Sequence, residues 1–238
     1  ADIIFKYFPN FNEKQVEQIT KLFDLYQYHN ARVNVISRKD MDNFYIHHVL
    51  HSLSLLNIAD FQHVKSVIDM GTGGGFPGIP LAIALPEIQF HLVDSIGKKI
   101  QVVNTIASEI GLTNLRASHS RVENIDEKFD MAVSRAVAPT KDLMNWMNPS
   151  KNKVLIDVAC GTGDLGKLFL DLTSKDGKIF CVDPNKGMIG KGKTKLTTYK
   201  NINWVIAPAE KLPVKDNSCD YYTISFGLRN TKDLNKAL

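Results

Sequence analysis

Cysteines are few and long apolar runs are missing in this chain, and each shortage excludes a class of protein. The three cysteines, Cys160, Cys181 and Cys219, are odd in number and form no C-x-x-C pair. This spacing indicates neither a disulfide framework nor a zinc site, so we expect reduced, buried thiols. No run of about eighteen apolar residues occurs, which predicts no transmembrane segment. The first residues lack the basic start and cleavage site of a signal peptide, which predicts a cytoplasmic protein.

The remaining composition is typical of a globular protein. Of the 238 residues, 44% are hydrophobic and 23% are charged, which excludes disorder, collagen and coiled coil. The net charge of +4 is uneven, because residues 1–148 hold 14 basic and 16 acidic side chains while residues 149–238 hold 15 and 9. A nucleic-acid partner is therefore permitted by the charge but not required by it.

The order of apolar runs predicts an α/β fold. Residues 1–60 place apolar side chains at helical spacing, which predicts a helical N-terminal cap. After residue 60, short apolar runs alternate with helical patterns, and this rhythm predicts a mostly parallel, doubly wound sheet. The strands expected in this first unit are residues 64–70, 90–94, 115–118 and 129–134.

The strand and glycine-loop pattern then starts again. Asp69 ends a strand before a glycine loop, and Asp157 does the same about 88 residues later. Asp94 and Asp183 end the next strand of each copy. We therefore expect two partial βα units, divided at residues 148–152, where apolar periodicity stops. The predicted parts are residues 1–60 as the cap, 61–148 as the first unit and 152–238 as the second.

The two glycine loops indicate a ligand that contains a ribose. Closely spaced glycines between a strand and a helix bring backbone N–H groups close to a ligand. The spacing fits neither the dinucleotide G-x-G-x-x-G pattern nor a P-loop, so NAD and ATP are disfavoured. Asp94 and Asp183 lie where a carboxylate can accept both hydroxyls of a ribose. The alternative for each loop is a tight turn without a ligand.

These motifs carry resemblances to two families. The first 148 residues resemble the small-subunit rRNA guanine-N7 methyltransferases, called RsmG or GidB, through NVIS at 34–37, GTGGGFPGIP at 71–80, LVDS at 92–95, RVE at 121–123 and SRA at 134–136. Residues 152–238 resemble the UbiE/COQ5 quinone-ring C-methyltransferases, through DVACGTGD at 157–164, AEKLP at 209–213 and ISFGLRN at 224–230. Both resemblances imply a Rossmann-like class I methyltransferase fold with S-adenosylmethionine as the cofactor.

The resemblances also imply roles for particular residues. In the first unit they place the methionine side of the cofactor at the loop, the ribose at the second strand, the adenine after the third and the pocket floor after the fourth. The corresponding residues are Gly71, Gly73 and Phe76 for the methionine side, Asp94 for the ribose, Val122 and Glu123 for the adenine, and Arg135 for the pocket floor. In the second unit the matching positions are Thr162, Asp183, Pro208, Ala209 and Ser225, with Asp183 again at the ribose.

Substrate and activity depend on which resemblance governs. The first implies 16S rRNA or the small ribosomal subunit as the partner, and the second implies a prenylated quinol. Guanine N7 carries a free lone pair, so no general base is expected there, whereas methylation of a quinol carbon requires one. Family members carry seven strands, and each unit here shows four. A third hypothesis is therefore an inactive cofactor-binding chimera, and the halves of a natural repeat could also complete one another.

Three histidines form a cluster at helical spacing. His47, His48 and His51 lack the glutamate of the H-E-x-x-H pattern, so we expect a helical surface patch and no metal site. The RsmG resemblance has Arg and Asp where this chain has His47 and His51. An RNA-binding role for this patch is not assigned from the sequence.

Overall fold

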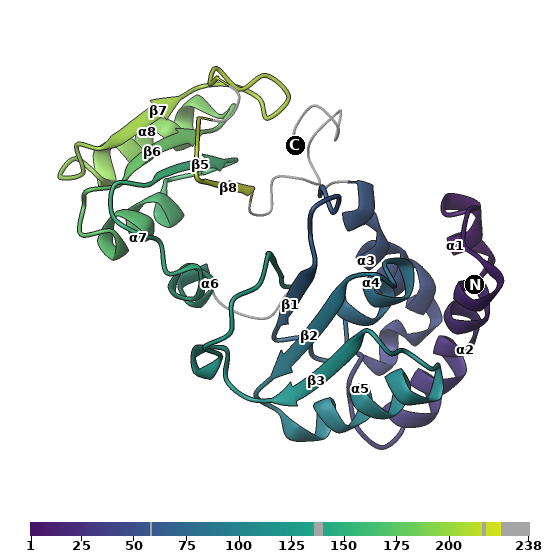
Figure 1. Ribbon diagram of the computed structural model, residues 1–238. Coiled ribbons are helices and arrows are strands. Elements are labelled where there is room, and N and C mark those ends of the chain that lie inside the picture. The colour runs from purple at the N-terminus through teal and green to yellow at the C-terminus, as the bar shows by residue number, and fades with distance from the viewer. Residues whose placement is uncertain (58, 136–139, 216–217, 225–238) are drawn as a thin grey trace. The chain divides into compact units, whose positions relative to one another are not determined.

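The computed structural model describes residues 1–57, 59–135, 140–215 and 218–224, and the chain forms two compact units (Figure 1). The first unit is Ala1–Val137 and the second is Ala138–Leu238. The sequence placed the division at residues 148–152, which is too late. Helix α6 (Thr140–Met147) packs against a helix of the second unit, and Met144 is buried in the core of that unit. The burial of Met144 therefore assigns α6 to the second unit.

Helices form the N-terminal part of the first unit. Helix α2 begins after Asn12, whose side chain accepts from Gln15 N while the Gln15 side chain accepts from Asn12 N. This capping box satisfies two backbone N–H groups that the first helical turn leaves free. The helices and helical turns are α1 (Asp2–Tyr7), α2 (Glu13–Asn30), η1 (Arg38–Asn43), η2 (Phe44–Leu50), α3 (His51–Leu53) and η3 (Ser54–Asn57).

A four-stranded parallel sheet follows, in the order β3-β2-β1-β4. The predicted parallel α/β fold is confirmed. The chain leaves β1 toward β2 on one side, and β4 adds on the other side, so the strand order reverses between β1 and β4. Ligands of open α/β sheets bind at the carboxyl ends of the strands beside such a reversal. The elements are β1 (Ser66–Met70), α4 (Gly78–Ala84), β2 (Gln89–Asp94), α5 (Gly97–Glu109), β3 (Leu115–His119), η4 (Val122–Asn124) and β4 (Met131–Val133).

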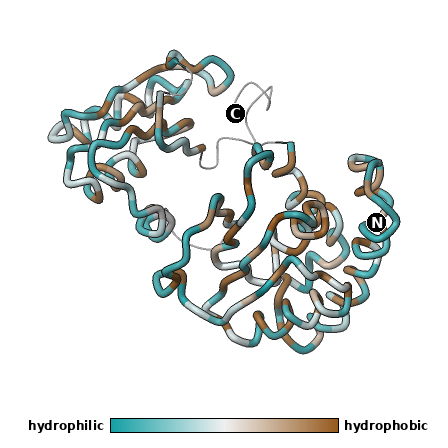
Figure 2. Tube along the Cα trace, in the orientation of Figure 1, coloured by the Kyte–Doolittle hydropathy of each residue, from teal (hydrophilic) through white to brown (hydrophobic). Residues whose placement is uncertain are grey.

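One hydrophobic core joins the N-terminal helices to this sheet. Ile19 and Leu22 of α2 are fully buried in the same cluster as Ile79 of α4 and Leu92 of β2. Figure 2 traces hydrophobic residues along the chain in the orientation of Figure 1. Burial of these side chains is the main stabilising term for the unit. The helices of residues 1–57 and the sheet are therefore parts of one packed body.

The second unit repeats this architecture, with a parallel sheet in the order β7-β6-β5-β8. Successive side chains of the central strand enter different clusters, with Leu155 in one and Ile156 and Val158 in the other. Cys181 is buried as expected, whereas Cys160 and Cys219 are partly buried, and all three thiols are free. The elements after α6 are β5 (Val154–Val158), α7 (Asp164–Leu172), β6 (Lys178–Val182), α8 (Lys186–Lys195), β7 (Ile202–Val205) and β8 (Tyr221–Ile224).

No helix in the described part of the chain is both long enough and apolar enough to cross a membrane. The longest is α2, at 18 residues, and it carries charged side chains along its length.

Candidate functional site

The glycine loop between β1 and α4 is fastened to the end of β2. Gly71, Gly73 and Gly75 have φ values of 67°, 59° and 95°, a region that side chains rarely allow. Gly73 N donates to Asp94 Oδ2 at 2.8 Å, and Ile96 N donates to Asp94 Oδ1 at 2.8 Å. The carboxylate of Asp94 thus fixes both the glycine loop and the turn that leads into α5.

The arrangement leaves room and hydrogen-bonding capacity for a ligand beside this loop. Each oxygen of Asp94 accepts one backbone N–H, and a carboxylate oxygen can accept a second donor. A Cβ atom added at Gly73 would meet no heavy atom within 4 Å, so the loop borders open space at this point. Two neighbouring hydroxyl groups of a ribose fit this combination of open space and free acceptor positions.

A second carboxyl group lies buried beneath the loop. Asp69 Oδ2 accepts from Thr72 Oγ1 at 2.6 Å and from Gly78 N at 2.9 Å, while Asp69 Oδ1 has no hydrogen-bond partner. Complete burial raises the pKa of Asp69 to about 7. An unpartnered buried carboxylate oxygen is costly, so it favours a cationic or hydrogen-donating ligand at the loop.

Aromatic side chains support the far side of the loop. The Phe76 ring is 3% exposed and lies 4.9 Å from the Tyr26 ring and 5.9 Å from the Phe44 ring, centroid to centroid. Tyr26 Oη donates to Gly74 O, which ties the loop to α2. Because its ring is buried, Phe76 shapes the loop through packing against the N-terminal helices.

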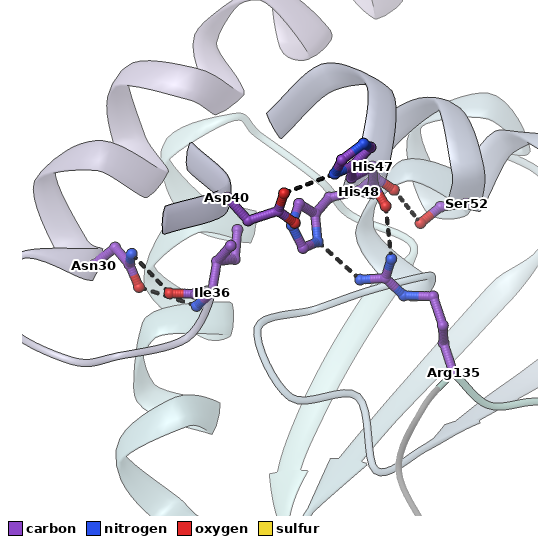
Figure 3. A network of polar contacts seen from close by, with 7 residues as sticks. All are labelled: Asn30, Ile36, Asp40, His47, His48, Ser52 and Arg135. Atoms are coloured by element: carbon purple, nitrogen blue, oxygen red, sulfur yellow. Dashed lines mark hydrogen bonds and ion pairs between the residues drawn. The ribbon is translucent and has the colours of Figure 1, made fainter. Parts of the chain in front are cut away.

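Arg135, which follows β4, is held by a chain of polar contacts that reaches η1 (Figure 3). Its Nη1 donates to His47 O at 2.9 Å, and its Nη2 donates to His48 Nδ1 at 3.0 Å. His48 Nε2 and His47 Nδ1 in turn contact the two oxygens of Asp40 at 2.8 and 2.6 Å. The guanidinium carbon lies 5.4 Å from the centre of the Phe76 ring, within reach of a cation–π interaction.

These contacts determine the tautomer and the charge of His48. Its Nδ1 accepts from Arg135, so the ring proton lies on Nε2 and points to Asp40. Burial, followed by the charge of Arg135, lowers the pKa of His48, so the ring is neutral at pH 7. Burial lowers the pKa of Arg135, and the charges of Asp69 and Asp40 oppose this effect, but no carboxylate forms an ion pair with Arg135 within the described residues.

The surface patch expected from the three histidines is therefore only partly correct. His47 and His51 are exposed, but His48 is partly buried and contacts Arg135. Sequence reasoning missed Asp40 altogether. Asp40 reaches both His47 and His48 because η1 packs against η2. No local sequence pattern predicts this contact.

The expected adenine side lies after β3. Ser120 N donates to Asp94 O at 3.1 Å, which brings the end of β3 to the end of β2. Val122 and Glu123 form η4 directly afterwards, with Val122 partly buried and Glu123 exposed. The structure thus places both residues on the same edge of the sheet as Asp94, two and three residues beyond this contact.

The second unit repeats the loop fastening. Gly161 N donates to Asp183 Oδ2 at 2.9 Å, and Asn185 N donates to Asp183 Oδ1 at 2.8 Å. Ala159 takes a φ of 55° at the position that corresponds to Gly71. Asp157 repeats Asp69, because one of its oxygens has no partner and burial raises its pKa to about 7.

The two loops differ at the position of Thr72, which Cys160 occupies in the second unit, and the threonine of the second loop lies two residues later. Thr162 Oγ1 donates to Asp164 Oδ2 at 2.7 Å, at the start of α7, and Lys195 forms an ion pair with the same carboxylate. Asp157 Oδ1 instead accepts a hydrogen bond from Thr223 Oγ1 of β8 at 2.9 Å. Thr162 therefore stabilises the helix start.

The remaining predicted residues of the second unit follow β7 or lie beyond β8. Pro208 is exposed and its carbonyl accepts from Lys211 N at 3.2 Å, while Ala209 is 9% exposed. Ser225 lies outside the described residues. Among the residues that the structure describes, no group of three or more His, Cys, Asp or Glu side chains could hold a metal ion.

Comparison with known proteins connects this geometry to a family. Residues 15–179 match the family described as rRNA small subunit methyltransferase G, which is well over half of the chain. The chain belongs to this family. Residues 131–238 also match the ubiE/COQ5 methyltransferase family, so the two matches overlap over residues 131–179. The pattern of two families in one chain, expected from the motifs, is confirmed.

Similar curated proteins carry the same family name. The Ribosomal RNA small subunit methyltransferase G of Phocaeicola vulgatus is 55% identical over 143 residues, which are 60% of this chain and 68% of that protein. The protein of the same name from Porphyromonas gingivalis is also 55% identical over 143 residues, 60% of this chain and 65% of that protein. The chain thus spans about two thirds of the length of these relatives.

Solved structures show lower similarity. An S-adenosylmethionine-dependent methyltransferase from Aquifex aeolicus is 18% identical with a TM-score of 0.38, and the match covers 41% of this chain and 53% of that one. The YcgJ protein from Bacillus subtilis is 21% identical with a TM-score of 0.36, over 42% of this chain and 45% of that one.

Proposed function

We propose that the first unit binds S-adenosylmethionine and transfers its methyl group to N7 of a guanine in 16S rRNA of the small ribosomal subunit. Membership of the rRNA small subunit methyltransferase G family supports this function. The observation that carries it is the loop beside Asp94, where Gly73 borders open space and each oxygen of the Asp94 carboxylate accepts one backbone N–H.

The residues present fit this cofactor. Asp94 would accept the ribose hydroxyls, and Val122 and Glu123 would border the adenine. The unpartnered oxygen of Asp69 beneath the loop suits a ligand that carries positive charge, as S-adenosylmethionine does at its ammonium and sulfonium groups. The cofactor supplies an already activated methyl group, so the protein has to bind and orient the reactants.

The chemistry asks little of side chains as acids or bases. Guanine N7 holds a lone pair in its neutral form, so no group has to remove a proton before methyl transfer. Alignment of the lone pair with the methyl group supplies most of the acceleration. Arg135 follows β4 at the sheet reversal and forms no ion pair within the described residues, so we assign it to holding the anionic substrate near the loop. We also propose that the protein acts in the cytoplasm, where small subunits are found.

A second candidate function is methylation of a quinol ring carbon by the second unit. The ubiE/COQ5 match over residues 131–238 and the contact between Gly161 and Asp183 favour it. In this alternative the chain is a fusion of segments from two families. A prenylated quinol requires detergent or lipid for activity, whereas RNA binding weakens as salt rises.

Methyl transfer from radiolabelled S-adenosylmethionine to small ribosomal subunits that lack the modification tests the proposal. We expect label in the RNA, at least 100-fold less label with Asp94→Asn, and unchanged label with the matched variant Asp183→Asn. Hydrogen exchange of β1 and β5 serves as the control for folding of each unit. Transfer to a quinol that depends on Asp183 would contradict the proposal in favour of the alternative. Cofactor binding without methyl transfer to either substrate would contradict both functions and favour the hypothesis of an inactive cofactor-binding chimera.

A further inference from the structure

A groove with basic walls lies beside the glycine loop of the first unit. Its volume is about 640 Å³, and it is open to solvent. It runs between the segment after α2 and the start of α5, and its walls hold three cationic side chains and no carboxylate. We call it the basic groove, and it is lined by Asn34, Val35, Ile36, Ser37, Arg38, Lys39 and Lys99.

The charges of the basic groove are not neutralised within the protein. Arg38 and Lys39 are exposed, and Lys99 is partly exposed. None of the three forms an ion pair with a residue in the described part of the chain, whereas Lys167 and Lys195 of the second unit do. Neighbouring cations repel one another, so this grouping carries a cost that an anionic ligand removes.

The groove wall is held at both ends. The side chain of Asn30 accepts from Val35 N at 2.8 Å. It also accepts from Ile36 N at 3.0 Å and donates to Ile36 O at 2.9 Å (Figure 3). At the other end, Asp40 is bound by His47 and His48. The backbone of the intervening segment, residues 37–39, is therefore held at both ends before any ligand arrives, which lowers the cost of ordering it on binding.

The basic groove adjoins the proposed cofactor loop. A Cβ atom added at Gly74 would lie 2.8 Å from Val35 O, so the groove wall and the loop are in direct contact. Lys99 belongs to the first turn of α5, the helix that begins after the Asp94 turn. A chain of phosphates lying in the groove would thus pass beside the loop that Asp94 fastens.

We propose that the basic groove binds the phosphate backbone of the RNA substrate and positions the strand beside the cofactor loop. The inference rests on the proposed function, because it names how that substrate is held. Phosphates fit better than bases, since the lining offers cations and the polar groups of Asn34 and Ser37 but no aromatic ring for stacking.

Binding of the purified chain to small-subunit rRNA, measured by filter retention between 50 and 200 mM KCl, tests the groove. The variant combines Arg38→Gln, Lys39→Gln and Lys99→Gln. Each lost phosphate contact makes the slope of log K against log salt less negative by roughly 0.7 for single-stranded RNA, so we expect a change of about 2. We also expect at least tenfold weaker binding at 100 mM KCl.

A matched control removes three exposed lysines that lie outside the groove, through Lys6→Gln, Lys14→Gln and Lys128→Gln. It has the same net charge as the groove variant, and we expect it to bind RNA as the parent does. Equal weakening in both variants would overturn the proposal, because it would show an effect of net charge alone. An unchanged slope in the groove variant, or no RNA binding by the parent chain, would also overturn it.

Two further readouts separate this inference from the proposed function. Binding of S-adenosylhomocysteine should be the same in the groove variant and the parent, because none of the three cations touches Asp94. In methyl transfer, a higher KM with unchanged kcat supports the groove, and unchanged kcat and KM overturn it while leaving the function intact. Groove-dependent RNA binding without any methyl transfer would support the groove and contradict the function.

Discussion

Asp69 is the buried carboxyl group from which the sharpest stability prediction follows. It is fully buried beneath the glycine loop, one of its oxygens has no partner, and burial raises its pKa from 3.8 to about 7. The substitution Asp69→Asn keeps the shape of the side chain and an acceptor for Thr72 and Gly78, but it removes the charge. The variant therefore isolates the effect of ionisation.

The magnitude follows from proton linkage. The folded chain keeps the proton on Asp69 up to a pH of about 7, while the unfolded chain releases it near 3.8, its ordinary pKa. The folded state therefore binds more protons between these values, and stability falls as the pH rises through this window and levels off above it. Each pH unit corresponds to about 1.4 kcal/mol, so Asp69 should remove about 3 kcal/mol of stability between pH 5 and pH 8.

The assay has to report on the first unit alone. Both tryptophans, Trp146 and Trp204, belong to the second unit, so tryptophan fluorescence follows that unit only. Hydrogen exchange of the β1 amides, corrected for intrinsic rates, gives the free energy of opening of the first unit. We expect this free energy in the parent to fall by about 3 kcal/mol more than in Asp69→Asn between pH 5 and pH 8.

Comparing two proteins at two pH values cancels the cost of the new amide, because that cost does not depend on pH. Asp157→Asn is the matched control, since Asp157 is similarly buried and has a raised pKa of about 7 in the second unit. It should flatten the pH dependence of β5 and leave β1 unchanged. An identical pH dependence of β1 in the parent and in Asp69→Asn would refute the reasoning.

Three further substitutions probe the polar chain and the loop. Asp40→Asn removes the charge that holds the Nε2 proton of His48. We therefore expect kcat/KM for methyl transfer to fall about tenfold, with unchanged affinity for S-adenosylhomocysteine. A loss of cofactor affinity in calorimetry would contradict this expectation. Gly78→Ala would place a Cβ 2.6 Å from Leu92 Cγ and should destabilise β1 by about 1–3 kcal/mol in hydrogen exchange. Gly73→Ala, with open space around it, should cost only its backbone strain of about 1 kcal/mol, and equal losses at both glycines would contradict the packing argument.

The sheet architecture could be predicted from the sequence because its signals are local. Asp69 and Asp157 lie one residue before the ends of apolar strands that precede glycine loops, and the structure places both residues at equivalent positions of two parallel sheets. Asp94 and Asp183 were expected at the ends of the second strands, and both accept the same pair of backbone N–H groups there. Strand ends and glycine turns are set by neighbouring residues, so a sequence shows them.

The parts that could not be predicted depend on contacts between distant segments. Arg135 reaches His48 across 87 residues, and only the packing of η2 beside the end of β4 brings them together. The division between the units was misplaced for the same reason, because the burial of Met144 depends on α7, which follows it by about twenty residues.

Calorimetric titration with S-adenosylhomocysteine tests the central claim, that the first unit holds the cofactor beside Asp94. The parent chain, Asp94→Asn and Asp183→Asn would be compared, with hydrogen exchange confirming that each unit stays folded. We predict that the parent binds, that Asp94→Asn loses binding at the first unit, and that Asp183→Asn retains it. No binding by the parent, or binding that is lost only in Asp183→Asn, would contradict the account.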